Sequence, residues 1–192
     1  MGHAVLCAQR VVGDEPFAVI LADDLIDDGS TGCLAQMVRQ FEQQGCSLLG
    51  VEEIAPTETD KLARVDAMIE KPKPEIAPST LAVVGRYILN PRIFDLLATQ
   101  PVGAGGEIQR TDAIARLLKE SLVLAYRFEG KRYDCGSKLG YLEATVQYAL
   151  KHPELGRDFK NYLRSLNGDF VPKPTYTEDQ HPKISMIKRQ AP

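Results

Sequence analysis

Short apolar runs alternate with amphipathic segments along this chain. The runs at Phe17–Ala22, Cys46–Glu52 and Ala82–Leu89 predict strands that are buried on both faces of a sheet. Thr31–Gln44 has apolar residues at helical spacing and is followed by Gly45, which predicts a helix and its end. Alternation of such strands and helices is typical of an α/β fold.

The same pattern predicts further elements of both kinds. Val65–Ile69 is expected to form another strand. Val123–Phe128 and Lys131–Tyr133 flank Glu129-Gly130, which predicts a β-hairpin. Additional helices are expected at Ala4–Gln9, Pro91–Thr99, Thr111–Glu120, Leu139–Lys151 and Phe159–Leu166.

The apolar pattern stops near Gly168, and this sets the expected domain organisation. We expect one α/β domain over residues 1–168 and a tail or linker over residues 169–192, where prolines and charges replace the apolar positions. A chain of 192 residues is large enough to bury about 70% of its unfolded surface. Its 44% hydrophobic and 26% charged residues are typical of a globular protein.

Charge, hydropathy and cysteine spacing exclude several classes of protein. A net charge of −3 and a pI near 5.7 give no basic surface for nucleic acid. The sequence contains neither an apolar run of about 18 residues nor a signal peptide at its start. Its 4 cysteines lack CxxC spacing and a matching histidine cluster, which favours reduced thiols over zinc or disulfides. We therefore expect a cytoplasmic protein that binds neither nucleic acid nor membrane.

Two adjacent carboxylates, Asp23 and Asp24, directly follow the Phe17–Ala22 run. Ligands of α/β proteins bind beyond the carboxyl ends of the strands, and an unpaired carboxylate is too costly to bury. Both carboxylates are therefore expected at the rim of the sheet, where one could hold a divalent cation against a phosphate. The alternative interpretation is a solvated turn whose second aspartate caps the next element.

Three later segments carry polar residues that could bind a ligand or a metal ion. Glu70 and Lys71 lead into a proline-rich exit; a carboxylate can bind sugar hydroxyls and a lysine can bind a phosphate. Glu107 follows Gly105-Gly106, which permits close approach of the backbone to a ligand. Asp134 precedes a glycine and a helix, where a second metal ligand or an anion site can form. A charged turn, a loop before a helix and a capping residue are the respective alternatives.

The order of these segments resembles one family, the bacterial UTP–glucose-1-phosphate uridylyltransferases (UDP-glucose pyrophosphorylases) among the sugar-phosphate nucleotidyltransferases. The resemblance covers about residues 2–163, and Asp134-Cys135-Gly136 is more similar to uridylyl than to thymidylyl transferases. The matching segments are Gly2-His3-Ala4-Val5, Asp23-Asp24-Leu25, Ile69-Glu70-Lys71-Pro72-Lys73-Pro74, Val83-Val84-Gly85-Arg86-Tyr87, Gly105-Gly106-Glu107-Ile108-Gln109 and Tyr133-Asp134-Cys135-Gly136.

The resemblance implies a fold, an activity and a set of site residues. The implied fold is a Rossmann-like mixed sheet flanked by helices, and the implied enzyme is a homo-oligomer. It transfers UMP from UTP to glucose 1-phosphate and gives UDP-glucose and pyrophosphate. By the same resemblance Asp23 and Lys71 are catalytic, and Asp23 and Asp134 hold Mg²⁺. The residues that the resemblance assigns to substrate binding are Gly2 (in a loop that approaches the base), Asp24, Glu70, Val83, Gly85 and Glu107.

The sequence departs from the family at three places. The opening strand of the family and its G-x-G-T-R loop have no counterpart before Gly2, so the expected sheet lacks its usual first strand. The segment Thr59–Val65 is shorter than in the family, and Arg110 stands where the family has an apolar residue. The alternative function is therefore a truncated, non-catalytic module that binds sugar phosphate, or one that a partner completes.

Overall fold

The computed structural model describes residues 2–53, 61–69, 79–101 and 108–166. The chain divides into two compact units, residues 1–146 and residues 147–192, and one helix crosses the boundary between them. The predicted tail, residues 169–192, lies outside the described residues.

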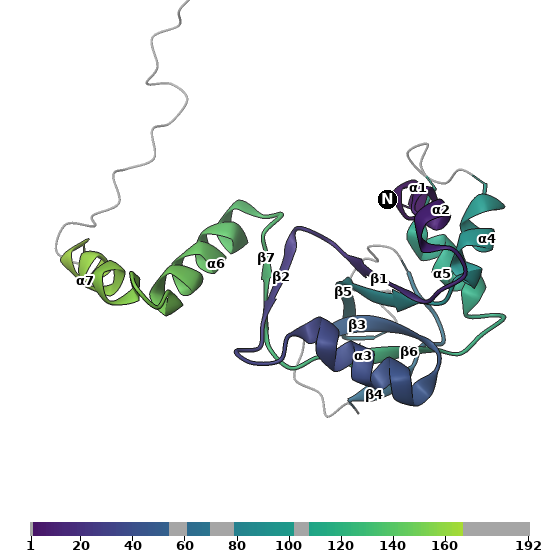
Figure 1. Ribbon diagram of the computed structural model, residues 1–192, viewed down its shortest axis with the longest axis horizontal. Coiled ribbons are helices and arrows are strands. Elements are labelled where there is room, and N and C mark those ends of the chain that lie inside the picture. The colour runs from purple at the N-terminus through teal and green to yellow at the C-terminus, as the bar shows by residue number, and fades with distance from the viewer. Residues whose placement is uncertain (1, 54–60, 70–78, 102–107, 167–192) are drawn as a thin grey trace, which may run out of the picture. The chain divides into compact units, whose positions relative to one another are not determined.

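Within the described residues, the first unit contains a five-stranded sheet and a separate two-stranded ribbon (Figure 1). The sheet has the order β1-β5-β3-β6-β4, and the ribbon pairs β2 with β7. In the sheet β3 and β6 are parallel and the other neighbours are antiparallel, so the sheet is mixed. The strands are β1 (Phe17–Ile20), β2 (Asp24–Asp27), β3 (Ser47–Glu53), β4 (Leu62–Arg64), β5 (Leu81–Leu89), β6 (Val123–Arg127) and β7 (Lys131–Asp134).

Helices occur in both units. Among the described residues, none of them combines the length and the apolar character that a membrane crossing requires. The helices are α1 (Gly2–Cys7), α2 (Gln9–Val12), α3 (Cys33–Gln44), α4 (Arg92–Ala98), α5 (Arg110–Leu117), α6 (Lys138–Lys151) and α7 (Gly156–Leu166).

The sheet has an apolar core on each face because successive side chains of a strand point to opposite sides. On β3, Leu49 packs with residues of α1, α4 and α5, whereas its neighbour Leu48 packs with residues of α3. On β5, Tyr87 likewise belongs to the core with α1, α4 and α5, whereas Ile88 belongs to the core with α3. Figure 1 shows α3 lying across one of these faces, where its Met37 is completely buried. The described part of the sheet is therefore flanked by helices.

Several predicted elements are confirmed. β3, β5 and the helices α3 to α7 lie at the predicted positions within a few residues, and α1 with α2 cover the predicted N-terminal helix. Gly45 ends α3 as predicted: its φ is +65°, and its N–H donates to the Phe41 carbonyl at 2.8 Å. A positive φ of this kind is typical of a glycine at a helix C-terminus.

The prediction that Phe17–Ala22 is buried on both faces is wrong. In the part of the chain that the structure describes, β1 is an edge strand that pairs antiparallel with β5. Phe17 and Val19 face the core, whereas Ala18 and Ile20 are exposed. An uninterrupted apolar run therefore does not by itself distinguish a central strand from an edge strand.

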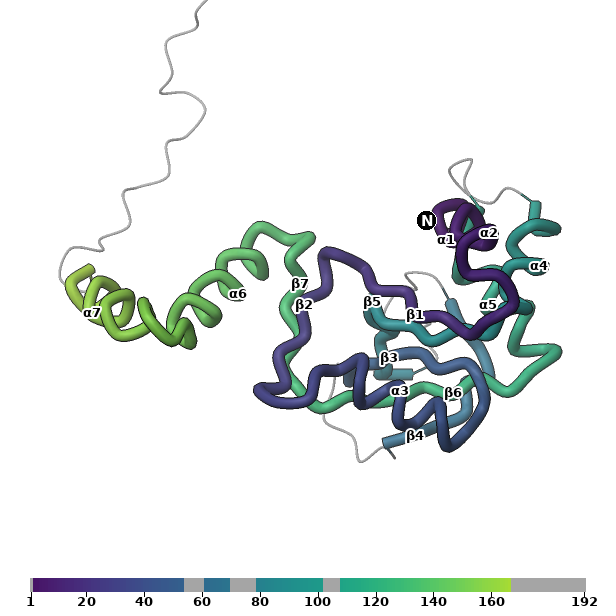
Figure 2. Tube along the Cα trace, in the orientation of Figure 1, coloured from purple at the N-terminus to yellow at the C-terminus, as the bar shows by residue number. Residues whose placement is uncertain are grey.

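The predicted hairpin of β6 and β7 is also wrong. β6 lies between β3 and β4 in the sheet, so both of its edges are already paired. The chain turns at Gly130, where φ is +129°, and β7 pairs with β2 instead. Figure 2 shows the traces of β2 and β7 running side by side.

The strand predicted at Val65–Ile69 lies earlier in the chain. Strand β4 covers Leu62–Arg64, and residues 65–69 are irregular. One backbone hydrogen bond, from Val65 N to Val123 O at 3.0 Å, continues the pairing with β6 before the chain leaves the sheet.

Replacing Phe94 by alanine tests how much the apolar core between β1 and the helices α1, α4 and α5 contributes to stability. The Phe94 ring is 1% exposed and stacks on Phe17 with the ring centroids 4.6 Å apart. Because a buried aromatic side chain loses both its apolar contacts and its packing, Phe94→Ala is expected to lower the free energy of unfolding by about 3–5 kcal/mol. Chemical denaturation measures this change. Val11→Ala, at a side chain that is 90% exposed, is the control and is expected to stay within about 0.5 kcal/mol of the parent.

Candidate functional site

Two exposed carboxylates from distant parts of the sequence meet at one end of the β2–β7 ribbon. Asp23 directly precedes β2, and Asp134 is the last residue of β7, opposite Asp24 in the register. The Cys135 N–H donates to the Asp23 carbonyl at 2.7 Å. A Cβ atom placed on Gly136 would lie 3.1 Å from Asp134 Oδ1 and 3.4 Å from Asp23 Oδ2. Side-chain oxygens of both carboxylates therefore lie close to the same glycine.

The turn into α6 fixes the Asp134 side of this pair. The Gly136 N–H donates to Asp134 Oδ1 at 3.1 Å. Ser137 donates to the Asp134 carbonyl through its N–H at 3.2 Å and its hydroxyl at 3.0 Å. The Ser137 hydroxyl oxygen in turn accepts the Gly140 N–H at 3.0 Å. A shallow hollow adjoins this turn, and it is lined by Cys135, Gly136, Ser137, Lys138, Tyr141 and Leu142.

Asp24 differs from its neighbour, because its side chain is 8% exposed. Its Oδ2 accepts the Gly85 N–H of β5 at 2.7 Å, and its Oδ1 accepts the Arg132 Nε–H of β7. The expectation that both carboxylates lie at the rim is therefore wrong for Asp24. A buried carboxylate is tolerated when it is paired and hydrogen-bonded, and here an arginine and a backbone N–H meet that condition.

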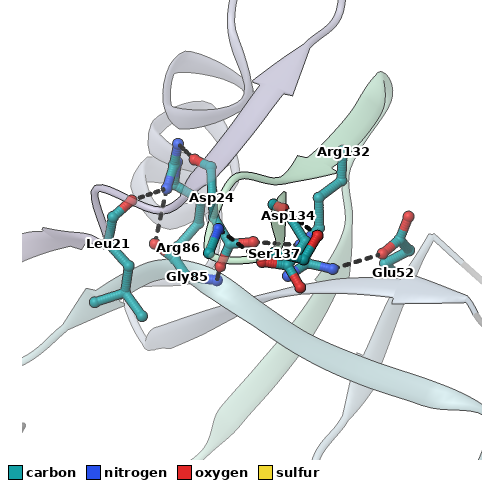
Figure 3. Close-up of polar contacts among 9 residues, drawn as sticks. Leu21, Asp24, Glu52, Gly85, Arg86, Arg132, Asp134 and Ser137 are labelled. Atoms are coloured by element: carbon teal, nitrogen blue, oxygen red, sulfur yellow. Dashed lines mark hydrogen bonds and ion pairs between the residues drawn. The ribbon is translucent and has the colours of Figure 1, made fainter. Parts of the chain in front are cut away.

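Two arginines surround Asp24 (Figure 3). Arg132 bonds Asp24 and extends its Nη1 to Glu52 Oε2 on β3 at 3.4 Å. Burial opposes the charge of Arg132, but the bond to Asp24 and the negative charges of Asp24, Glu52 and Asp134 outweigh burial and raise the pKa of Arg132. Arg86 donates to the carbonyls of Leu21, Gly85 and Asp24. Arg132 is thus held in its charged form.

The exposed carboxylate pair has the donor chemistry that a hard cation requires. Mg²⁺ prefers oxygen ligands and is often held by one or two carboxylates together with substrate phosphates and water. Asp23 and Asp134 supply two such carboxylates. Among the described residues no cluster of three or more metal-ligating side chains is found.

Two of the predicted substrate-binding residues lie on β5. Gly85 is buried, and an added Cβ would lie 2.5 Å from Asp24 Oδ2 and 2.6 Å from the Cβ of Leu21. Leu21 also donates its N–H to the Gly85 carbonyl at 2.9 Å. Val83, two residues earlier, is half-buried and packs against the apolar core. Gly85 therefore permits the close approach that seats Asp24.

Gly2 lies at the first residue of α1, so the expectation of a loop there is wrong. It is buried, and its N–H donates to the Ile108 carbonyl at 3.0 Å. An added Cβ would lie 2.5 Å from that same oxygen and 3.0 Å from Leu97 Cδ2. Gly2 thus seats α1 against the segment before α5. The other predicted site residues, Glu70, Lys71 and Glu107, lie outside the described residues.

Sequence reasoning assigned no role to Arg86 or Arg132, although Arg86 stands inside a segment that carries the resemblance and Arg132 directly precedes another. A usable signal was present in the sequence. Asp24 follows an apolar run, and a buried carboxylate needs a cation as partner. Arg86 directly follows Gly85, and Arg132 lies two residues before Asp134. The pairing of Asp24 with Arg132 depends on the β2–β7 register. A hairpin of β6 with β7, as predicted from the sequence, is incompatible with that register.

Comparison with known proteins assigns the family. A family model described as nucleotidyl transferase matches residues 1–151, which is most of the chain. The chain belongs to the nucleotidyl transferase family. This membership confirms the predicted resemblance at the level of the family, and the matched residues include both the five-stranded sheet and the β2–β7 ribbon.

Individual proteins of known name or structure are also similar to this chain. A UTP–glucose-1-phosphate uridylyltransferase of Pseudomonas aeruginosa is 49% identical over 158 residues, which are 76% of this chain and 57% of that protein. The corresponding protein of Escherichia coli is 46% identical over 188 residues, with 88% and 61% covered. A UTP-bound UGPase from Acinetobacter baumannii is similar in structure, with a TM-score of 0.77, 41% identity, and 86% and 61% covered.

These comparisons confirm the expected mixed sheet flanked by helices as the fold of a nucleotidyl transferase. The chain spans about three fifths of the length of the curated relatives that it matches.

Replacing Gly85 by alanine tests whether β5 needs a glycine to seat Asp24. The added carbon would displace the Asp24 carboxylate and leave a buried charge without its partners. Such a loss is expected to cost about 3 kcal/mol or more in the free energy of unfolding. Urea denaturation of the full chain measures it.

Gly13→Ala is the control for this experiment, because Gly13 has φ +68° and nothing within 4 Å of an added Cβ. Backbone strain alone is expected to cost about 1–2 kcal/mol there. Equal losses in the two variants would show that crowding at Asp24 is not what requires Gly85.

Proposed function

We propose that this chain carries the sugar-phosphate and metal-binding side of a UTP–glucose-1-phosphate uridylyltransferase. The proposed reaction transfers UMP from UTP to glucose 1-phosphate and gives UDP-glucose and pyrophosphate. The observation that carries the proposal is the pair of exposed carboxylates, Asp23 and Asp134, which β2 and β7 bring to one place. The names of the relatives in Pseudomonas aeruginosa and Escherichia coli support the choice of substrates.

In the proposed reaction a phosphate oxygen of glucose 1-phosphate forms a bond to the α-phosphorus of UTP. The bond from that phosphorus to the oxygen that bridges it to the β-phosphorus breaks, and its electron pair leaves with pyrophosphate. Phosphoryl-type transfers of this kind depend mainly on the position of the substrates and on neutralisation of their charge. The residues of this chain are therefore assigned to these two tasks.

Asp23 and Asp134 are the residues proposed to hold Mg²⁺. When bound, Mg²⁺ neutralises charge on phosphate oxygens and orients the substrates. Asp24 is proposed to support the site without contacting the cation, because both of its carboxylate oxygens bond to other groups of the protein. Its proposed part in substrate binding is thereby indirect.

The remaining assignments follow the resemblance. Lys71 is proposed to neutralise the phosphate of glucose 1-phosphate, Glu70 to bind sugar hydroxyls, and Glu107 to line the sugar pocket; the three lie outside the described residues. A lysine provides a compact positive charge, and a carboxylate accepts hydrogen bonds from hydroxyls. Val83 and Gly85 are proposed to line the sugar pocket from β5.

Assembly as a homo-oligomer and a cytoplasmic location belong to the same proposal. The first half of α6 exposes apolar side chains, with Leu139 68% and Leu142 59% exposed, which supports a protein contact there. The mass of the full chain in solution, measured by light scattering, tests the oligomer.

Release of pyrophosphate tests the proposed function. The full chain, supplied with UTP, glucose 1-phosphate and Mg²⁺, is expected to release pyrophosphate, and chelation by EDTA is expected to stop the release until Mg²⁺ is restored. Asp23→Asn keeps the size of the side chain and removes its charge. Because a bound cation contributes several kcal/mol to stabilisation of the transition state, Asp23→Asn is expected to lower kcat/KM by about 100-fold or more.

Asp14→Asn is the matched control, since Asp14 is an exposed carboxylate in the turn before β1. It is expected to keep the parent rate. A folded chain that binds glucose 1-phosphate in calorimetry but releases no pyrophosphate would contradict the proposed catalysis and favour a non-catalytic sugar-phosphate-binding module.

A further inference from the structure

The β2–β7 ribbon carries both proposed metal ligands but is separate from the five-stranded sheet. Backbone pairing between β2 and β7 fixes Asp23 and Asp134 relative to each other. Their position relative to the sheet depends on contacts between the ribbon and the strands β3 and β5. These contacts centre on the buried Asp24 carboxylate and on the half-buried side chains of Arg86 and Arg132 around it (Figure 3).

Asp24 joins the ribbon to β5. Its Oδ2 accepts the Gly85 N–H at 2.7 Å, while its Oδ1 is held by Arg132 from β7. Arg86, the next residue on β5, donates to the carbonyl of Leu21 at 3.1 Å and to the carbonyl of Asp24. Asp23 lies between these two carbonyls in the chain, so Arg86 and Asp24 fix the turn that presents it.

Arg132 joins the same ribbon to β3. Its guanidinium bonds Asp24 through Nε and reaches Glu52 Oε2 through Nη1 at 3.4 Å. The Arg132 side chain is 25% exposed, Asp24 is 8% exposed and Glu52 is 41% exposed, so the bond to Asp24 is better shielded from water than the pair with Glu52. A guanidinium is a rigid, planar fork that can hold two carboxylates at once, whereas a lysine ammonium is a single charge on a flexible stem.

We propose that Arg132 is a positioning residue for the cation site, acting through Asp24 and Glu52. By tying the ribbon to β3, Arg132 sets where Asp23 and Asp134 stand, and by neutralising Asp24 it keeps that carboxylate from competing for the cation. This inference rests on the proposed function, because it assigns Asp23 and Asp134 to the cation. Groups that orient metal ligands typically change metal affinity or activity by about 10–100-fold when they are removed.

Arg132→Lys provides the test, with Arg127→Lys as its matched control. Arg127 lies on β6 and pairs with Glu53 of β3 at 2.9 Å, so the control also replaces a partly buried arginine that bonds a glutamate of the same strand. The full chain is titrated with Mn²⁺ alone, and free Mn²⁺ is followed by electron paramagnetic resonance. Thermal unfolding and the Mg²⁺ concentration that gives half-maximal turnover are measured on the same samples.

Arg132→Lys is expected to raise the Mn²⁺ dissociation constant and the Mg²⁺ requirement by about 10-fold or more. Arg127→Lys is expected to change both by less than about 2-fold, even if it lowers the unfolding temperature by the same amount. A purely structural role of Arg132 would make the two variants equal in metal affinity, and that result would overturn the proposal.

Asp24→Asn separates positioning from direct ligation. It keeps an acceptor for Gly85 but weakens the bond to Arg132, so it is expected to raise the Mn²⁺ dissociation constant about as much as Arg132→Lys does. Loss of Mn²⁺ binding in Asp24→Asn with unchanged binding in Arg132→Lys would make Asp24 the ligand and overturn the proposal.

The titration also separates this inference from the proposed function. If the parent chain binds Mn²⁺ and releases no pyrophosphate, the proposed function fails, and the Mn²⁺ affinities of the variants still decide the role of Arg132. If the parent chain binds no Mn²⁺, Arg132 has no cation site to position and the inference fails.

Discussion

The Asp24 carboxylate lies buried between strands of two different sheets, and its partners offset the cost of that burial. Gly85 donates from β5 and Arg132 from β7, so the Asp24 side chain helps to connect the sheet to the ribbon. A buried ion pair contributes little net stability compared with an apolar contact, but it fixes the register and orientation of what it joins. At this position orientation matters, because Asp23 and Asp134 stand at the end of the ribbon that Asp24 holds.

The fold was predictable where the sequence pattern is local. Apolar runs at β3 and β5 are strands because both faces of the sheet are covered, and Gly45 ends α3 because the backbone there has positive φ. The pairing of strands was not predictable from local pattern. Within the described residues, the edge position of β1 and the pairing of β7 with β2 depend on contacts between distant segments. An apolar run or a turn signal in the sequence does not indicate which segments will be in contact.

The candidate site was predictable in its exposed residues and not in its buried ones. The placing of Asp23 after a strand and of Asp134 before a helix made each a candidate metal ligand, and the family resemblance paired them; the structure brings the two close together. The adjacent Asp24 carries the same charge, yet it is buried, because Arg132 and Gly85 reach it from segments far along the chain. Identical side chains next to each other thus lie in different surroundings, set by tertiary contacts that one sequence does not specify.

The most direct measurement is an anomalous-scattering map from crystals of the full chain grown with Mn²⁺ and UTP. A cation held as proposed gives a peak within about 2.3 Å of carboxylate oxygens of both Asp23 and Asp134, with Asp24 still bonded to Arg132. A peak on Asp24, or one that contacts neither Asp23 nor Asp134, would contradict the assignment of the cation site and the positioning role that depends on it.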